Sequence, residues 1–439
     1  MKKHIKLFIV LGIILVGSFS FYLFEGYKKD ALVYENNKIM PSSSGISMML
    51  ETEAGSGNYE MTTRSEWPTE GYVFNANLSK CENGSELSWN NENKNVLMSG
   101  NKSDKCYVYF DVEIPPTIAN TCSSGTNLAS CIKTFGDKGP SVSNIYHHDA
   151  SLTNGAGDNS YRYAGASGEV NNYVCFGSTQ SPCPADNLYR IIGVFGDRVK
   201  LIKSDYATTA LLGTDGDYKQ AYTATGNASS NYKGNNLANI AAYTWNYKNN
   251  TTINSGYGSN TWSTSLLNKT NLNQNFITNI GADWAAKIAE TTWKVGGNAW
   301  ANIGTQPAKT AYQNEIVSPV TTNSQDNATE LKAKIGLMYV SDYMYAVPQD
   351  KWTLVGYNSD ASKDYRAATS VNWMYMGLYE WTISRYADNA YDVFYVYYTG
   401  YVNYYIANNA YGVRPVFYLS SSVNYASGSG SATDPILVN

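Results

Sequence analysis

The sequence predicts an α+β fold: a mixed C-terminal domain, preceded by a small β-sandwich-like module and an N-terminal membrane helix. An uncharged run of apolar and small residues extends from Leu7 to Phe24, and short alternating apolar runs follow between residues 71 and 116. Beyond residue 121 the apolar spacing changes from strand-like to helical and back again. A chain of 439 residues also has room for more than one folded unit.

Residues 1–30 predict a signal anchor or a signal peptide. Lys2, Lys3 and Lys6 precede the apolar run, which favours a cytoplasmic N-terminus and a membrane-spanning helix. A cleaved signal peptide is the alternative, since Ser18 and Ser20 could precede a cleavage site. Both alternatives place the rest of the chain outside the cytoplasm, either membrane-anchored or secreted. Residues 31–60 are polar and rich in serine and glycine, so we expect a stalk.

Cysteine usage agrees with an oxidising compartment. Six cysteines allow fifteen connectivities, and we expect disulfides. No pair has CxxC spacing, so neither a metal site nor a cofactor is expected. In sequence order the cysteines form three adjacent pairs, Cys81 and Cys106, Cys122 and Cys131, and Cys175 and Cys183.

Residues 61–116 are predicted to form the small β-sandwich-like module. Asparagine, glycine and serine turns separate its apolar runs, and a bond between Cys81 and Cys106 would tie two strands together. Pro115 and Pro116 make a natural boundary.

Residues 121–439 predict the larger mixed domain. A hairpin is expected from Ile191–Phe195 and Val199–Ile202 around a Gly196-Asp197 turn. Residues 210–260 are predicted to be a long loop-like insertion. Apolar residues between 266 and 288 have helical spacing, which predicts two or three short helices grouped between runs of strands.

Catalytic and nucleic-acid-binding signatures are weak. The net charge is −4 and the basic residues are scattered, which argues against a nucleic-acid partner. No catalytic motif is present, and no catalytic residue is predicted. We expect His147 and His148 to lie in an exposed loop. Three acidic residues that folding could pair, Asp342, Glu380 and Asp388, are expected to be surface or turn carboxylates.

Tyrosine is concentrated near the C-terminus. Residues 372–411 hold 11 of the 38 tyrosines. Residues 391–398 and 401–406 alternate as two strands joined at Thr399-Gly400. Tyrosine gives rigid, amphipathic contact area, and asparagine and serine beside it give adaptable hydrogen bonds, which favours a recognition surface. The alternative is that tyrosine serves only as a good strand former with half-buried rings.

The segment 386–411 has a restricted alphabet. It contains only Tyr, Ala, Asp, Asn, Val, Phe, Thr, Gly and Ile. All nine can be reached from an Asn codon of the AAY type by replacing its adenines. Lys, Glu, Gln, Met and Trp, which cannot be reached in this way, are absent from the segment.

The order of several motifs resembles a known group of proteins. The motifs "LYRIIGVF", "VKLIKSD", "KIGLMYVSDYMYA", "NWMYMGLYEWTISR" and "GVRPVFYLSSSV" are similar to an uncharacterised bacterial cell-surface domain family. They also resemble the formylglycine-generating-enzyme branch of the C-type lectin fold, over residues 121–439. The segment 386–411, just before Gly412 and Arg414, is similar to the variable region of diversity-generating-retroelement variable proteins.

The resemblance implies a scaffold and a variable ligand-binding surface. It does not imply the enzyme activity, because the copper-holding C-terminal cysteine pair is absent, nor calcium-dependent sugar binding, because the EPN, QPD and WND motifs are absent. We therefore expect a non-enzymatic surface protein that binds an external protein or glycan. The alternatives are a hydrolytic or modifying enzyme on the same scaffold, and a structural or adhesive surface component.

The expected contact residues all lie in the tyrosine-rich segment. Val393, Val396, Gly400 and Val402 are expected to be frame residues. Arg385 and Arg414 flank the segment and could orient an anionic ligand, but we expect salt-bridged structural arginines. The predicted contact residues are Tyr386, Asp388, Tyr391, Asp392, Tyr395, Tyr397, Tyr398, Tyr401, Asn403, Tyr404 and Tyr405.

Overall fold

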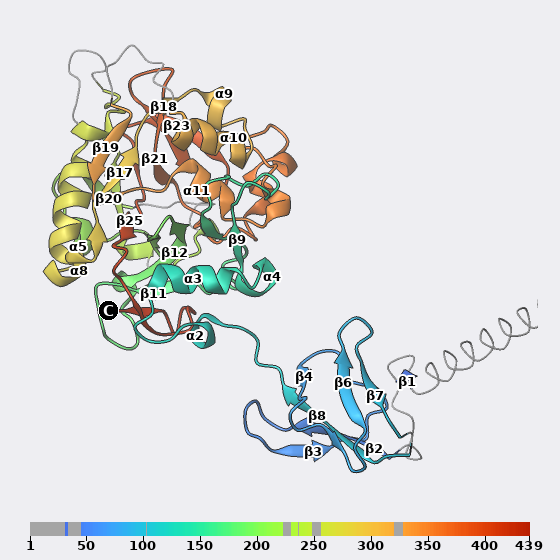
Figure 1. Ribbon diagram of the computed structural model, residues 1–439. Helices are drawn as coiled ribbons and strands as arrows, with labels where there is room; N and C mark the ends of the chain where they lie inside the picture. Colours follow the sequence, from blue (N-terminus) through green and yellow to red (C-terminus); the bar gives the residue numbers. More distant parts are fainter. Residues whose placement is uncertain are drawn as a thin grey trace, which may run out of the picture. The chain divides into compact units, whose positions relative to one another are not determined.

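A computed structural model describes residues 31–33, 45–101, 103–222, 230–235, 237–247, 256–319 and 328–439 (Figure 1). The chain divides into two compact units, residues 1–115 and 116–439. The predicted signal anchor or signal peptide, residues 1–30, lies outside the described residues, as do residues 34–44 of the predicted stalk. Among the residues described, no helix is both long enough and apolar enough to cross a membrane.

The first unit has two sheets around an aromatic core. One sheet has the order β1-β7-β6, and the other has the order β3-β2-β8-β4, with β5 also paired to β8. Trp67, Val108 and Phe110 are among its buried core residues. The strands are β1 (Ala31–Val33), β2 (Ile46–Glu51), β3 (Tyr59–Met61), β4 (Tyr72–Phe74), β5 (Lys80–Cys81), β6 (Glu86–Asn90), β7 (Asn95–Ser99) and β8 (Cys106–Val112).

The prediction of a polar stalk over residues 31–60 is wrong for its second half. β2 pairs in parallel with β8, with Met48 opposite Val108 and Leu50 opposite Phe110. Met48 and Leu50 are buried because alternate residues of β2 face the core of the first unit. Residues 46–51 therefore form a central strand of this unit.

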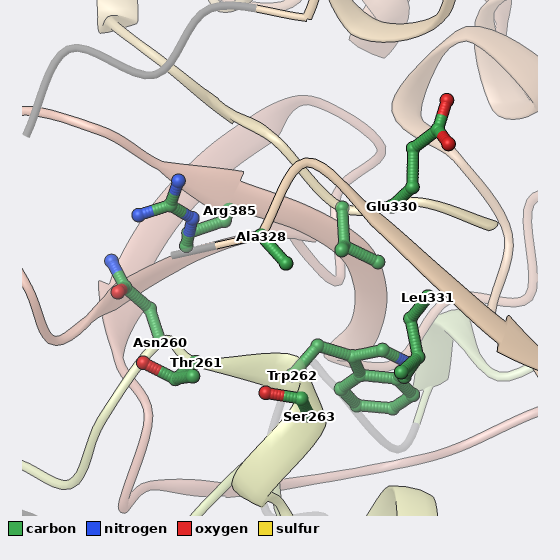
Figure 2. A pocket seen from close by; sticks show the side chains of 9 residues that line it. Asn260, Thr261, Trp262, Ser263, Ala328, Glu330, Leu331 and Arg385 are labelled. Atoms are coloured by element: carbon green, nitrogen blue, oxygen red, sulfur yellow. The ribbon is translucent and has the colours of Figure 1, made fainter. Parts of the chain in front are cut away.

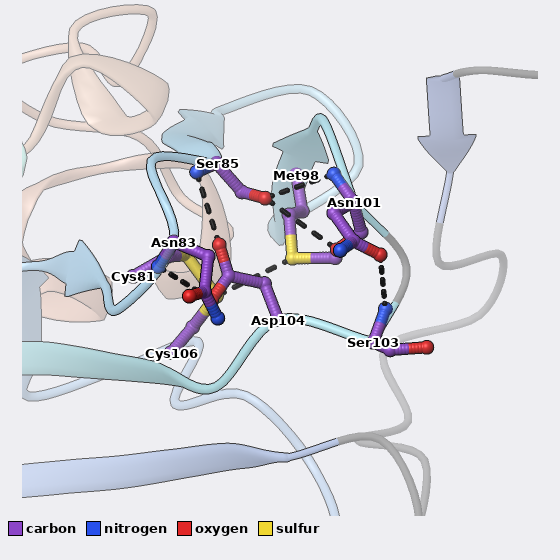
Figure 3. The surroundings of a disulfide bond; sticks show 8 residues. All are labelled: Cys81, Asn83, Ser85, Met98, Asn101, Ser103, Asp104 and Cys106. Atoms are coloured by element: carbon purple, nitrogen blue, oxygen red, sulfur yellow. Dashed lines mark hydrogen bonds between the residues drawn. A yellow bond between two sulfur atoms is a disulfide. The ribbon is translucent and has the colours of Figure 1, made fainter.

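The Cys81–Cys106 disulfide joins β5 to β8, whose pairing places the two cysteines directly opposite one another (Figure 3). Beside it, the fully buried Asp104 accepts hydrogen bonds from the backbone N–H groups of Asn83 (2.8 Å) and Ser85 (3.1 Å). These bonds compensate the buried carboxylate, so the disulfide and Asp104 together hold the loop before β6.

The largest sheet of the second unit has the strand order β16-β25-β13-β12-β10-β9, and β11 and β20 pair at its sides. Its β12–β13 hairpin confirms the predicted one: Phe195 pairs with Arg198 around Gly196-Asp197, and Gly196 has a φ of 62°. The strands are β9 (Ile145–His147), β10 (Tyr161–Tyr163), β11 (Tyr173–Cys175), β12 (Leu188–Phe195), β13 (Arg198–Lys203), β16 (Ile288–Ala289), β20 (Ile335–Gly336) and β25 (Val416–Leu419).

Smaller sheets complete the second unit. The order β18-β21-β22-β23 forms one, β14-β15-β24 another, and β17-β19 and β26-β27 are two-stranded. β14 and β15 lie in the region predicted to be a long loop-like insertion. The strands are β14 (Tyr218–Ala221), β15 (Ala241–Thr244), β17 (Thr291–Lys294), β18 (Gly297–Asn298), β19 (Glu330–Ala333), β21 (Glu380–Tyr386), β22 (Asp392–Val396), β23 (Val402–Ile406), β24 (Ala410–Tyr411), β26 (Tyr425–Ser427) and β27 (Leu437–Val438).

The helical segments are short and are spread along the second unit. They are α2 (Ile118–Thr121), α3 (Leu128–Gly136), α4 (Pro140–Ser143), η1 (Ala185–Asn187), α5 (Thr209–Leu212), η2 (Leu237–Asn239), η3 (Trp262–Thr264), η4 (Leu267–Phe276), α7 (Ile277–Asn279), α8 (Ala282–Ala286), α9 (Trp300–Ile303), α10 (Ala308–Tyr312), η5 (Gln313–Val317), α11 (Val340–Tyr345), η6 (Gln349–Lys351), η7 (Ala361–Lys363) and η8 (Tyr365–Ala368). Disulfides Cys122–Cys131 and Cys175–Cys183 fasten the start of this unit.

The predicted fold class is therefore wrong. A C-type-lectin-like α+β domain behind a β-sandwich-like module and a membrane helix does not describe this structure, which has several mixed sheets, 22% helix and 31% strand. The predicted two or three short helices are confirmed as η4, α7 and α8, which lie over residues 267–286 between β15 and β16. The periodicity of apolar residues did not predict the arrangement of the sheets, because short segments are buried by partners that lie far away in the sequence. One example is β25, which pairs with β13 on one side and with β16 on the other.

Two local predictions also need correction. His148 is not in an exposed loop: it is fully buried, its ring contacts Tyr345 and Trp352, and its Nδ1 accepts a hydrogen bond from the Ala156 N–H at 3.0 Å. Asp342 and Glu380 are buried too, 3% and 2% exposed, whereas Asp388 is exposed as expected. In each correction the burial comes from tertiary neighbours that lie far away in the sequence.

Candidate functional site

The tyrosine-rich segment forms a hairpin whose two faces receive different residues. β22 and β23 pair with Tyr395 opposite Asn403 and Phe394 opposite Tyr404, and this confirms the two strands predicted around Thr399-Gly400. Directly paired residues share a face, so Tyr395 and Asn403 lie on one face and Tyr404 on the other. The predicted contact residues are therefore divided between two faces.

On the first face, half-buried phenols surround Tyr397. Its ring lies 4.9 Å from that of Tyr379, 4.6 Å from that of Tyr398 and 4.5 Å from that of Tyr401, and all four side chains are half-buried. We name Tyr379, Tyr397, Tyr398 and Tyr401 the tyrosine cluster. The buried Tyr395 supports it from below, in contact with Tyr379 and Trp381.

Tyr398 and Tyr401 keep their hydroxyl protons at neutral pH. Burial, and then the neighbouring Tyr397, raise the pKa of Tyr401 to about 12. The charge of a neighbouring Tyr397 raises the pKa of Tyr398 as well. Each phenol can therefore donate and accept hydrogen bonds while its ring offers an apolar surface.

On the second face the tyrosines serve packing. Tyr386 stacks on Tyr404 with ring centroids 4.2 Å apart and planes 5° apart, and both contact Phe394. Trp300 covers Tyr404 from α9 with centroids 5.3 Å apart. Tyr386 is buried, so this stack belongs to the core of the second unit.

The remaining predicted contact residues lie at the ends of the hairpin. Tyr391 is half-buried against Tyr257, and the buried Asp392 accepts a hydrogen bond from Asn389 Nδ2 at 2.7 Å. Tyr405 is 46% exposed on the same face as Tyr395 and Asn403. Among the eleven predicted residues the structure leaves Asp388 and Tyr405 exposed, buries Tyr386, Asp392 and Tyr395, and half-buries Tyr391, Tyr397, Tyr398, Tyr401, Asn403 and Tyr404.

The predicted frame residues and one flanking arginine are structural. Val393, Val396, Gly400 and Val402 are buried. Arg414 is fully buried, donates from Nε to Glu380 Oε1 at 2.7 Å and from Nη2 to the Met374 carbonyl oxygen. Arg385 differs, because no ion pair joins it to any part of the chain that the structure describes.

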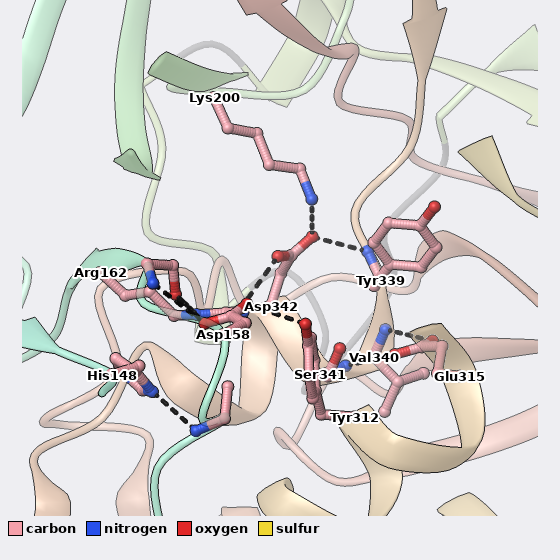
Figure 4. Close-up of polar contacts among 12 residues, drawn as sticks. His148, Asp158, Arg162, Lys200, Tyr312, Glu315, Tyr339, Val340, Ser341 and Asp342 are labelled. Atoms are coloured by element: carbon pink, nitrogen blue, oxygen red, sulfur yellow. Dashed lines mark hydrogen bonds and ion pairs between the residues drawn. The ribbon is translucent and has the colours of Figure 1, made fainter. Parts of the chain in front are cut away.

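Sequence reasoning missed a charged cavity of about 140 Å³ in the second unit. Figure 4 shows the polar contacts of Arg162, Lys200 and Asp342, which line it. Lys200 of β13 approaches Asp342 of α11, with Nζ 2.5 Å from Oδ2, and Arg162 of β10 lies 3.8 Å from the same carboxylate. Arg162 also pairs with Asp158 at 2.7 Å. The residues lining the cavity are Arg162, Phe195, Lys200, Thr292, Lys294, Tyr312, Ile316, Tyr339, Ser341, Asp342 and Tyr418.

Aromatic rings surround the lysine of this cavity. Lys200 Nζ lies 4.7 Å from the Tyr339 ring centroid, 5.3 Å from that of Phe195 and 5.4 Å from that of Tyr418. Burial lowers the pKa of Lys200, and Asp342 opposes that shift. A charged residue within an apolar strand, as in "RVKLIK", is the sequence signal that could have indicated this buried charge.

A buried glutamate lies next to the cavity. Glu315 accepts hydrogen bonds from the backbone N–H groups of Val340 (3.0 Å) and Ser341 (2.9 Å), and also from the Ser384 hydroxyl. Burial raises its pKa, while these hydrogen bonds oppose the shift. Glu315 therefore holds the start of α11, which carries Asp342. Within the described residues, no group of three or more His, Cys, Asp or Glu side chains is placed to hold a metal ion.

Comparisons with protein-family models, with curated proteins and with solved structures find no match for this chain.

Proposed function

We propose that this protein binds an external protein or glycan through the tyrosine cluster, without catalysing a reaction. The observation that carries the proposal is the contact of Tyr397 with three other tyrosines, all half-buried and gathered beside the turn of the hairpin. Nearby Asn403 and the exposed Tyr405 extend this surface. Rigid phenols give contact area at low entropic cost, and their hydroxyls give direction, which suits recognition of polar ligands.

The chain's environment fits an external ligand. Three disulfides indicate an oxidising, extracytoplasmic environment. For residues 1–30 we propose a role as the membrane anchor, or as a signal peptide if they are cleaved. A protease-protection assay on intact cells, with an antibody against the second unit, would test the external position.

Binding assays with matched tyrosine variants test the function. The full chain would be screened against a glycan array and a panel of cell-surface proteins, and hits would be measured by biolayer interferometry. We expect Tyr398→Ser combined with Tyr401→Ser to weaken binding at least tenfold, and Tyr397→Phe to weaken it less, because the ring remains. Tyr247→Ser is the control, since Tyr247 is 56% exposed. Unchanged binding by a double variant with a native circular dichroism spectrum would contradict the proposal.

A second candidate function, an enzyme acting on a small molecule, is favoured by the cavity at Lys200 and Asp342. Its volume of about 140 Å³ is close to that of engineered cavities of about 150 Å³ that admit benzene. A thermal-shift screen of small metabolites against wild type and Ile316→Trp, which fills the cavity, tests this function. A metabolite that stabilises only wild type, and that the protein converts, would favour the enzyme.

A further inference from the structure

Arg385 is a buried cation that has no anionic partner among the residues that the structure describes. It lies on β21, paired in parallel with Gly297 of β18, and its side chain packs so closely on Gly297 that a Cβ there would lie 3.0 Å from Cζ and Nη2. The residue is 1% exposed. Within the described residues none of its three guanidinium nitrogens makes a hydrogen bond.

The positive charges of the other buried arginines of the second unit are compensated by ion pairs or hydrogen bonds. Arg162 pairs with Asp158, and Arg414 pairs with Glu380. Arg190 donates to Asn172 Oδ1, to the Ser167 hydroxyl and to the Val170 carbonyl oxygen. A buried charge without partners carries a large desolvation cost, so the guanidinium of Arg385 favours a partner beyond the residues that the structure describes.

A small pocket opens beside this side chain (Figure 2). Its cavity of about 10 Å³ is about the size that one water molecule needs. Trp262 lines the same pocket, and its indole Nε1 is a second buried donor that has no acceptor in the described part of the chain. The lining residues are Asn260, Thr261, Trp262, Ser263, Val295, Ala328, Glu330, Leu331 and Arg385.

The carboxylate in the pocket lining is already engaged. Glu330 forms an ion pair with Lys294, and Figure 2 shows its carboxylate pointing away from the guanidinium of Arg385. Burial lowers the pKa of Arg385 to about 10, so the guanidinium stays charged at neutral pH.

We propose that Arg385 binds a small anion in this pocket, and that the anion is a carboxylate group entering end first. Neither terminal nitrogen of the guanidinium has a partner in the described part of the chain, and such a fork matches the two oxygens of a carboxylate. The cavity has room for about one water molecule, so only the leading end of a ligand can reach the guanidinium. This inference does not depend on ligand binding by the tyrosine cluster.

Anion-dependent stability of the full chain tests the proposal. Thermal unfolding would be followed in sodium formate, chloride and sulfate at matched ionic strength. We expect formate to raise Tm saturably in wild type, Arg385→Met to lose that response, and Arg385→Lys to need at least tenfold more formate, because lysine lacks the fork. Arg198→Met, a change at a half-buried arginine, is the control and should keep the wild-type response.

Several results would overturn the proposal. Equal responses of wild type and Arg385→Met would remove Arg385 from the site, and equal responses of wild type and Arg385→Lys would overturn binding through the guanidinium fork. A chloride response with the same midpoint as formate would overturn the carboxylate assignment. Asp326 lies outside the described residues, so Asp326→Asn is also needed: a formate response only in that variant would assign Arg385 to an internal ion pair. If Arg385→Met fails to fold, formate binding would be measured by the broadening of the ¹³C-formate NMR line. Broadening by wild type that is lost in Arg385→Lys would support binding at Arg385, and equal broadening would contradict it.

Discussion

Glu380 and Arg414 form a buried ion pair, with Arg414 Nε 2.7 Å from Glu380 Oε1 and both side chains at most 2% exposed. Arg414 precedes β25, while Glu380 begins β21, so the pair joins the tyrosine-bearing sheet to the largest sheet. Burial raises the pKa of Glu380, and Arg414 opposes that shift.

Removing one partner of this pair should destabilise the protein strongly. Arg414→Met leaves the Glu380 carboxylate buried without its cation, so we expect a loss of about 3–5 kcal/mol in the free energy of unfolding. Glu380→Met combined with Arg414→Met should recover much of that loss, since two apolar residues need no compensation. Urea unfolding of Glu380→Met, Arg414→Met and the double variant measures the coupling, and a double variant as unstable as the sum of the two single variants would contradict it.

Asp342 should matter more for stability than Lys200. Asp342→Asn leaves Lys200 buried with no ion-pair partner in the described chain, whereas Lys200→Met leaves Asp342 with Arg162 and with the Tyr339 N–H at 3.0 Å. We expect Asp342→Asn to cost about 3–5 kcal/mol and Lys200→Met clearly less. Urea unfolding at pH 7 measures which variant loses more free energy of unfolding. Equal losses would contradict the prediction, because they would show that Arg162 and the Tyr339 N–H do not stabilise Asp342 when Lys200 is removed.

His148 should make stability fall as the pH drops below about 6.5. Burial, and then the positive charge of Arg162, hold its pKa well below the usual value, so the native protein keeps it neutral where the unfolded chain binds a proton. Its contribution is therefore complete above the unfolded pKa and is lost as the pH falls toward the folded pKa. We expect His148→Gln to flatten the dependence of Tm on pH between about 5 and 6.5.

The control for this titration is His147→Gln, because His147 is half-buried and stacks on Tyr161. This variant should keep the wild-type slope. A slope equal in wild type and His148→Gln would assign the pH dependence to other groups.

If the segment 386–411 varies between clones, its structure restricts where. Substitutions should concentrate at half-buried or exposed positions such as Tyr398, Tyr401 and Tyr405, and should spare the buried Val393 and Tyr395. Deep sequencing of codons 370–420 across cells of one population, with a search of the flanking DNA for a template copy, measures this pattern. Variation spread evenly over buried and exposed positions would contradict a structural restriction, and an invariant segment would show a fixed surface.

Local features of the fold could be predicted from the sequence. The Gly196-Asp197 hairpin and the tyrosine-rich hairpin follow from alternation and turn residues, which act between neighbours in the chain. The frame residues Val393 and Val402 are buried as expected, because aliphatic side chains of paired strands pack against the core. The three disulfides each join cysteines that are adjacent in sequence order.

Tertiary structure decided the features that depend on distant partners. Lys200, Arg162 and Asp342 come from three separate elements, so their shared cavity leaves no local pattern. The sequence by itself determined where tyrosine is concentrated and that it would form a hairpin. Only the folded chain decided that Tyr386 and Tyr404 stack within the core while Tyr397, Tyr398 and Tyr401 gather on the other face, because pairing register and neighbouring elements set which phenols are covered.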